Sequence, residues 1–219
     1  MREKVHEILF YILVGAGYLL VCSTLPTLLA SEVVHGIGGD GNLYYALFSL
    51  LTGICFVRIL FRKTMEQMEI FSGISLGGIW EAIGTAALLF VVINFLVSPG
   101  LALLFPESAG NYESGVSDMM QTPAATFLQV AVIAPLWEEL IFRGFIMKRA
   151  LRLWSPTAAV FLTAFLFGAL HMSLVQGISA AAAGLLLCLL YVRRRSVGLN
   201  IFAHGLYNGM VFLMAMKMM

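Results

Sequence analysis

The sequence predicts an all-α membrane protein, a polytopic bundle of about seven transmembrane helices. Hydrophobic residues make up 60% and charged residues only 11% of its 219 residues, and the mean hydropathy is +0.93. In a soluble domain about a quarter of the residues are charged. The apolar residues also gather in runs of about 20, the length that crosses ~30 Å of hydrocarbon. We therefore expect residues 1–219 to form a single integral membrane domain, surrounded by the lipid bilayer.

Each of seven apolar runs is predicted to be one span. The runs are 8–30, 43–61, 74–97, 124–147, 156–172, 174–192 and 197–216. Basic residues precede the first run, as they would in a signal peptide. Its 23 residues exceed the roughly 7–15 of a signal-peptide core, so it is predicted to span the membrane. The run 156–172 has 17 residues, near the lower limit for crossing.

The distribution of basic residues predicts the orientation, because Lys and Arg accumulate in short cytoplasmic loops. Basic residues precede the first run, lie at the end of the second run and follow the fourth and sixth runs: Arg2, Lys4, Arg58, Arg62, Lys63, Lys148, Arg149, Arg152, Arg193, Arg194 and Arg195. The intervening loops 31–42 and 98–123 contain acidic residues but no Lys or Arg. We expect a cytoplasmic N-terminus and an external C-terminus, in the cell membrane of a prokaryote because the chain is short.

Composition also narrows the possible partners and cofactors. A net charge of +1 argues against a basic nucleic-acid-binding face, so no nucleic acid is expected as a partner. Cys22, Cys55 and Cys188 lie in separate runs without metal-binding spacing and are interpreted as packed thiols. No metal or cofactor is expected. Glu81 is predicted to be protonated or hydrogen-bonded between helices, or to lie close enough to the cytoplasmic end of its span to reach the membrane surface, with a role in lining the substrate cavity as the alternative.

The fourth run places two carboxylates and an arginine inside the membrane. Each ionised group near the bilayer centre costs roughly 2.5–3.5 kcal/mol, so such a cluster predicts a functional site. Glu139 and Arg143 are four residues apart with the acid first, which favours an ion pair. Glu138 points ~100° away and has no partner nearby in sequence, which makes it the candidate general base. Pro135 should free the carbonyl of Ala131 and bend the span.

Two later runs bring polar groups to a similar depth. At 1.5 Å per residue, Glu138 lies about 16 Å, His171 roughly 22 Å, His204 roughly 10 Å and Asn208 roughly 16 Å from the cytoplasmic ends of their runs. Polar groups at this depth need partners, so we expect one shared site. His204 and Asn208 share a helix face and suit an oxyanion hole. Phe167 is expected to pack beside His171, and a purely structural role fits it equally well.

The three motifs resemble, in their order along the chain, those of the CAAX-protease and bacteriocin-processing (CPBP, or Abi) intramembrane proteases. This family is related to the Ras-converting endoprotease of eukaryotes. The motifs are Glu138-Glu139-x-x-x-Arg143, Phe167-x-x-x-His171 and His204-x-x-x-Asn208. The resemblance covers about residues 120–215, the expected catalytic core, whereas residues 1–119 carry no recognisable motif.

The resemblance implies an endopeptidase that hydrolyses peptide bonds of a membrane-associated peptide or lipidated protein. It implies that Glu138 and His171 activate a water molecule, while His204 and Asn208 form the oxyanion hole. Glu139, Arg143 and Phe167 would then support the site.

Two alternatives remain open from the sequence. One is a zinc metalloprotease with a His₂Glu ligand set, although H-E-x-x-H is absent and asparagine is a poor zinc ligand. The other is a non-catalytic protein for bacteriocin immunity, scaffolding, peptide binding or transport. Proton-coupled transport predicts inverted repeats, which the sequence does not display.

Overall fold

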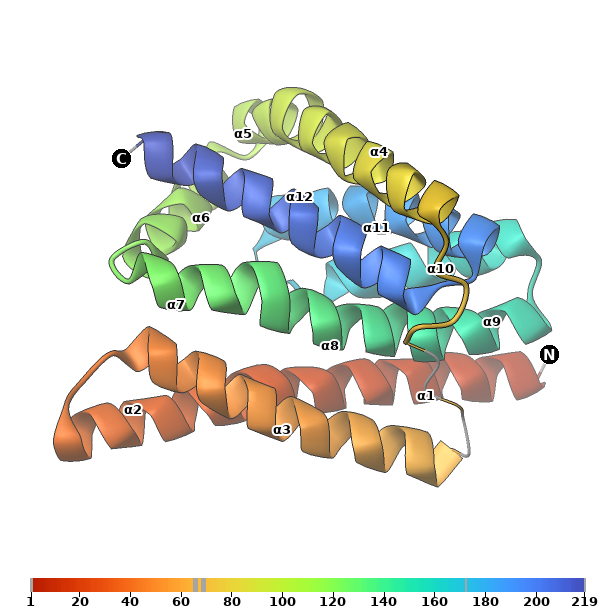
Figure 1. The fold of residues 1–219 in the computed structure, drawn as a ribbon, viewed down its shortest axis with the longest axis horizontal. Helices are drawn as coiled ribbons and strands as arrows, with labels where there is room; N and C mark the ends of the chain where they lie inside the picture. Colours follow the sequence, from red (N-terminus) through yellow and green to blue (C-terminus); the bar gives the residue numbers. More distant parts are fainter. Residues whose placement is uncertain (1, 65–66, 68–69, 172, 219) are drawn as a thin grey trace.

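The computed structural model describes residues 2–64, 67, 70–171 and 173–218, and every regular element in these ranges is a helix. The expected all-α polytopic bundle is therefore confirmed. Figure 1 shows the N-terminus and the C-terminus at opposite ends of the bundle. The predicted run 156–172 ends at Met172, which lies outside the described residues.

The first two long helices form an antiparallel pair along one side of the bundle. Helix α1 (Arg2–Leu19) continues through a π-helical turn (Leu20–Thr24) into α2 (Leu25–Ile37). Helix α3 (Gly41–Thr64) then runs back. The Asp40 side chain accepts hydrogen bonds from the backbone N–H groups of Asn42 and Leu43, at 2.9 and 3.1 Å. Asp40 thereby satisfies donors that the first turn of α3 leaves without partners.

The next segment crosses the bundle and ends in a polar helix. Helix α4 (Leu76–Val92) starts at Ser75, whose hydroxyl accepts from the N–H of Gly78. A π-helical turn (Ile93–Val97) joins α4 to α5 (Ser98–Leu104), and α6 (Pro106–Met119) follows.

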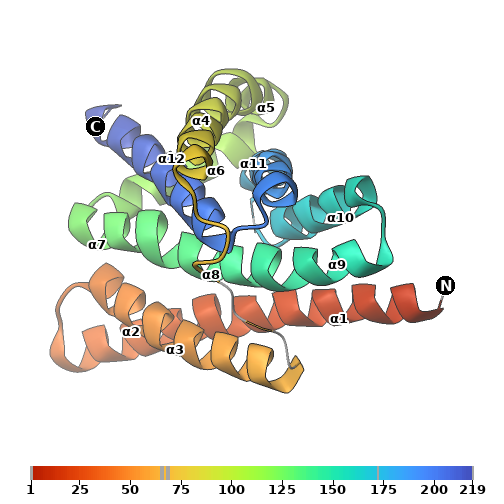
Figure 2. The same cartoon turned by 45° about the vertical axis from the view of Figure 1, so that its right-hand side comes forward.

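The centre of the bundle is one long helix with two π-helical stretches. It comprises α7 (Pro123–Phe127), the stretch Leu128–Ile133, α8 (Ala134–Ile141), the stretch Phe142–Met147 and α9 (Lys148–Leu153). All residues from 139 to 147 are buried. Figures 1 and 2 both show this helix between the α1–α3 side and the layer that contains α4 and α12. The candidate base Glu138 and the supporting Glu139 therefore lie on a largely enclosed element.

Three C-terminal helices complete the structure: α10 (Pro156–Ala169), α11 (Leu174–Arg194) and α12 (Val197–Met218). The Ser155 hydroxyl caps α10 by accepting from the N–H of Ala158. Arg195, in the left-handed region at φ 51°, ends α11 and turns the chain into α12.

Each of the seven predicted spans coincides with a helix, but five described helical segments are long and apolar enough to cross a membrane. These are Arg2–Ile37, Gly41–Thr64, Leu76–Leu104, Leu174–Arg194 and Val197–Lys217. The central helix carries the Glu138, Glu139 and Arg143 charges, and α10 has only 14 residues. Much of the central helix is buried against other helices rather than exposed to lipid. It can therefore carry charged residues that lower its mean hydropathy.

Candidate active site

The ion pair expected within the fourth run is present and fully enclosed. Arg143 Nη1 donates to Glu139 Oε1 at 2.8 Å, and both side chains are 0% exposed. Arg143 Nη2 also donates to the carbonyl of Gly184 in α11 at 3.1 Å. The guanidinium lies 4.9 Å from the ring centroid of Phe167 in α10. Arg143 therefore ties the central helix to two neighbouring helices, and a buried charge of this kind needs such partners.

His204 of α12 lies between the two glutamates. Its Nδ1 is 2.9 Å from Glu139 Oε1, and its Nε2 is 3.8 Å from Glu138 Oε2. A carboxylate can only accept, so Nδ1 must carry the proton in the shorter contact. The longer separation is beyond a direct hydrogen bond. Glu139 therefore orients the imidazole, and the other ring nitrogen faces Glu138.

Glu138 has a partner that local sequence spacing does not reveal. The hydroxyl of Tyr18 in α1 donates to Glu138 Oε1 at 3.3 Å. The Glu138 side chain is 15% exposed, whereas that of Glu139 is sealed. The two carboxylates thus have different environments, as expected for groups with different roles. The only feature of the sequence that could have drawn attention to Tyr18 is that its polar hydroxyl lies within the first apolar run.

His171 joins this cluster through an aromatic ring. Its Nδ1 is 3.0 Å from the backbone carbonyl of Phe167 and must donate to it, which leaves Nε2 as an acceptor in the neutral ring. The Phe167 ring centroid is 5.2 Å from that of His171 and 6.0 Å from that of His204. Phe167 therefore contacts both imidazoles and the Arg143 guanidinium, and it holds the cluster together.

Asn208 binds the backbone at the irregular part of the central helix. Its Nδ2 donates to the carbonyl of Val130 at 2.7 Å. The N–H of Ala134 is directed to the Gln129 carbonyl, and Pro135 has no N–H, so the Val130 carbonyl lacks a donor within its own helix. The predicted irregularity at Pro135 thus takes the form of a π-helical stretch. One N–H of the Asn208 side chain donates to the Val130 carbonyl, and the second amide hydrogen is available for other acceptors.

A glycine in α12 allows this close approach. A Cβ atom at Gly205 would lie 2.6 Å from the carbonyl oxygen of Ala131. Ala131 is the residue whose carbonyl the sequence expects Pro135 to release. The backbone of the central helix at Ala131 therefore lies directly against α12, the helix that carries His204 and Asn208.

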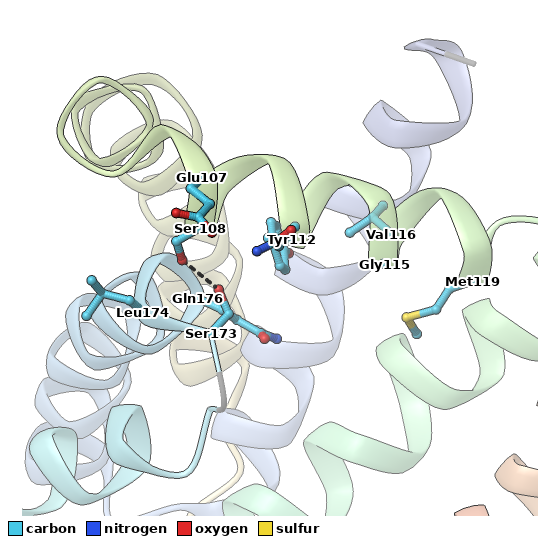
Figure 3. A pocket seen from close by; sticks show the side chains of 10 residues that line it. Glu107, Ser108, Tyr112, Gly115, Val116, Met119, Ser173, Leu174 and Gln176 are labelled. Atoms are coloured by element: carbon cyan, nitrogen blue, oxygen red, sulfur yellow. Dashed lines mark hydrogen bonds between the residues drawn. The ribbon is translucent and has the colours of Figure 1, made fainter.

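A separate pocket of about 620 Å³ lies between α6 and the start of α11, as Figure 3 shows. It is lined by Glu107, Ser108, Asn111, Tyr112, Gly115, Val116, Met119, Ser173, Leu174 and Gln176. The Ser108 hydroxyl is 3.3 Å from that of Ser173 and accepts from the N–H of Val175 at 3.3 Å. These bonds hold α6 against the turn between α10 and α11. Ser173 in this turn is two residues after His171. None of the residues that line this pocket is one of the candidate catalytic residues.

Glu81 and the three cysteines, which the sequence also singled out, are not among the candidate catalytic residues described above. Glu81 forms ion pairs with Arg193, at 2.8 Å, and with Arg194, which join α4 to the end of α11. Glu81 is therefore hydrogen-bonded between two helices, one of the surroundings expected from the sequence, and its partners are basic side chains that the sequence did not identify. Cys22 and Cys188 are buried, whereas Cys55 is exposed. Within the part of the chain that the structure describes, no group of three or more His, Cys, Asp or Glu side chains is arranged to hold a metal ion.

Comparisons with known proteins point to one kind of protein. Residues 120–210 match the family model described as "Type II CAAX prenyl endopeptidase Rce1-like". The Bacillus subtilis (strain 168) protein named "Putative membrane peptidase YdiL" is 25% identical over 227 residues, which cover 96% of this chain and 88% of that protein. No solved structure matches the chain. The matched stretch contains all three motifs and every candidate catalytic residue.

Proposed function

Because residues 120–210 belong to the Rce1-like family of CAAX-type membrane proteases, as their motifs predicted, we propose that Glu138 is the general base of an intramembrane endopeptidase. Its substrate is a membrane-associated peptide or a lipidated protein. One observation carries the assignment. Glu138 is partly exposed and faces His204 Nε2, whereas Glu139 is sealed in an ion pair with Arg143. Only the first carboxylate is free to take up a proton from a water molecule.

The proposed reaction is hydrolysis of an amide bond. Glu138 accepts a proton from water, the resulting hydroxide attacks the scissile carbonyl, and the C–N bond breaks as the proton passes to the leaving amine. The products are a carboxylic acid and an amine. His171 Nε2, an acceptor when Nδ1 donates to the Phe167 carbonyl, assists in holding the water.

His204 and Asn208 are proposed to stabilise the tetrahedral oxyanion. For this role His204 carries protons on both ring nitrogens, one directed to Glu139 and one to the oxyanion. Asn208 contributes the amide hydrogen that does not bind Val130. Donors aimed at charge that develops only in the transition state raise kcat more than they lower KM.

We also propose that the N-terminus lies in the cytoplasm of a prokaryotic cell. Figure 1 shows the N-terminus, the end of α3, α9 and the start of α12 at one end of the bundle. The basic residues on which the predicted orientation rests belong to these segments or come just before α12. One of them, Arg149 of α9, forms an ion pair with Glu7 near the N-terminus. Reporter fusions to each terminus test the assignment, and a cytoplasmic signal from the C-terminal fusion would contradict it.

Hydrolysis by the purified protein tests the function. Two internally quenched peptides share one sequence that ends in C-a-a-X, and one of them is prenylated at the cysteine. The wild-type protein and Glu113→Gln, which alters an exposed carboxylate of α6, are expected to cleave a probe. Glu138→Gln is expected to be inactive but folded, because glutamine keeps the shape without accepting a proton.

Three outcomes would contradict the proposal. Near-wild-type turnover by Glu138→Gln would remove Glu138 as the base. Activity that is lost in chelator and restored by zinc would favour the metalloprotease alternative. If the wild-type protein cleaves neither peptide, a binding or immunity function without hydrolysis is the better description.

A further inference from the structure

We propose that Tyr18 of α1 is a positioning residue of the active site, which holds the Glu138 carboxylate in its reactive orientation. The inference rests on the proposed role of Glu138. Tyr18 lies 120 positions from Glu138 and outside the residues 120–210 that match the family model. The first transmembrane segment, which carries no motif, would then supply part of the catalytic machinery.

The two oxygens of Glu138 have different neighbours. Oε1 accepts from the Tyr18 hydroxyl at 3.3 Å, and Oε2 faces Nε2 of His204 at 3.8 Å. The terminal torsion of a glutamate is soft, so a carboxylate without a fixed donor rotates freely. A donor on Oε1 restricts this rotation and keeps Oε2 directed at His204. Small errors in the placement of a reacting group are costly in rate.

Tyr18 is itself held by close packing of α1 on both sides. At Gly15, α1 contacts Leu170, the residue before His171, and a Cβ atom there would lie 3.2 Å from the leucine side chain. At Gly17, α1 contacts Phe56 of α3, and a Cβ atom would lie 3.1 Å from the ring. These contacts, three residues and one residue before Tyr18, pack the backbone of α1 closely against two neighbouring side chains and so fix the position of Tyr18.

The N-terminal helices also hold the residue before Glu138. A Cβ atom at Gly53 of α3 would overlap the indole of Trp137, so this ring rests directly on the α3 backbone. Trp137 is 5% exposed. Two consecutive residues of the central helix, Trp137 and Glu138, are thus contacted by α3 and by α1. The arrangement gives the N-terminal half of the chain a direct effect on the site.

Tyr18→Phe tests the proposal because it removes only the hydroxyl. Tyr11→Phe is the matched control, since Tyr11 is a buried tyrosine two turns earlier on the same helix. Losing a hydrogen bond to a charged group that is needed in the transition state lowers the rate of the chemical step roughly tenfold. We expect Tyr18→Phe to lower kcat for the cleaved C-a-a-X probe about tenfold, with KM and the unfolding temperature unchanged. Tyr11→Phe should retain wild-type kcat.

An infrared measurement reports the contact without any substrate. The difference between spectra of the wild-type protein and Glu138→Gln isolates the Glu138 carboxyl band. This band should shift in Tyr18→Phe and stay in place in Tyr11→Phe, because only the former loses a donor to the carboxylate.

The outcomes separate this inference from the proposed function. Wild-type kcat in Tyr18→Phe, or an unshifted carboxyl band, overturns the role of Tyr18 even when Glu138→Gln is inactive. Equal losses of kcat and unfolding temperature in both tyrosine variants also overturn it, since they indicate a packing effect. An active Glu138→Gln overturns the proposed function instead, and the infrared shift still reports the contact.

Discussion

Replacing Arg143 by methionine should destabilise the protein strongly, because it leaves a buried carboxylate without its cation. Methionine keeps most of the side-chain volume, so the change tests charge rather than packing. The structure shows three interactions that would be lost: the 2.8 Å ion pair with Glu139, the 3.1 Å hydrogen bond to the Gly184 carbonyl and the contact with the Phe167 ring. Removing one partner of a buried ion pair costs about 3–5 kcal/mol. That is a large part of the roughly 5–15 kcal/mol that stabilises a typical folded protein.

A second variant separates the unpaired charge from the loss of the arginine. Changing Glu139→Gln together with Arg143→Met removes both charges and keeps an oxygen that can accept from His204 Nδ1. Replacing a whole buried pair is often close to neutral, so the double variant should be more stable than Arg143→Met. Arg58→Met alters an exposed arginine of α3 and should change the free energy of unfolding by no more than about 0.5 kcal/mol.

Reversible denaturation of the purified protein in detergent micelles measures these free energies of unfolding. The reasoning is refuted if Arg143→Met is no less stable than Arg58→Met. It is also refuted if the double variant is as unstable as Arg143→Met, because the unpaired carboxylate would then not be the cause.

Other changes have expected outcomes of the same kind. Asn208→Ala should lower kcat by about 10²–10³-fold, which enzyme kinetics measures. It should also lower the free energy of unfolding by roughly 1–3 kcal/mol, because the Val130 carbonyl loses its donor, and denaturation measures this effect. His204→Ala should reduce kcat more than it raises KM, and an equal change in both would argue against an oxyanion role. Gly53→Leu should displace the Trp137 indole, which a change in tryptophan fluorescence would report. Exhaustive chelation should leave hydrolysis intact, and metal analysis of the purified protein should find no stoichiometric zinc.

Much of the site could be inferred from spacing within single helices. The Glu139–Arg143 pair follows from a four-residue separation, and the motifs with their order led to the family that the comparison of residues 120–210 supports. Contacts between helices could not be inferred in this way. Neither the bond from Tyr18 to Glu138 nor the bond from Asn208 to the Val130 carbonyl has a local pattern, because their partners are 120 and 78 residues apart.

The sequence by itself determined the membrane environment, the helical runs and the pairs that share a helix face. These properties depend on hydropathy and on a rise and rotation per residue that are the same in every α-helix. Only the tertiary structure decided which faces meet, since the rotation and crossing of helices depend on packing at particular residues. Gly53 admits the Trp137 ring, and Gly205 admits the Ala131 carbonyl. Those contacts bring helices from both halves of the chain to Glu138, where a helix-by-helix interpretation had left the carboxylate without a partner.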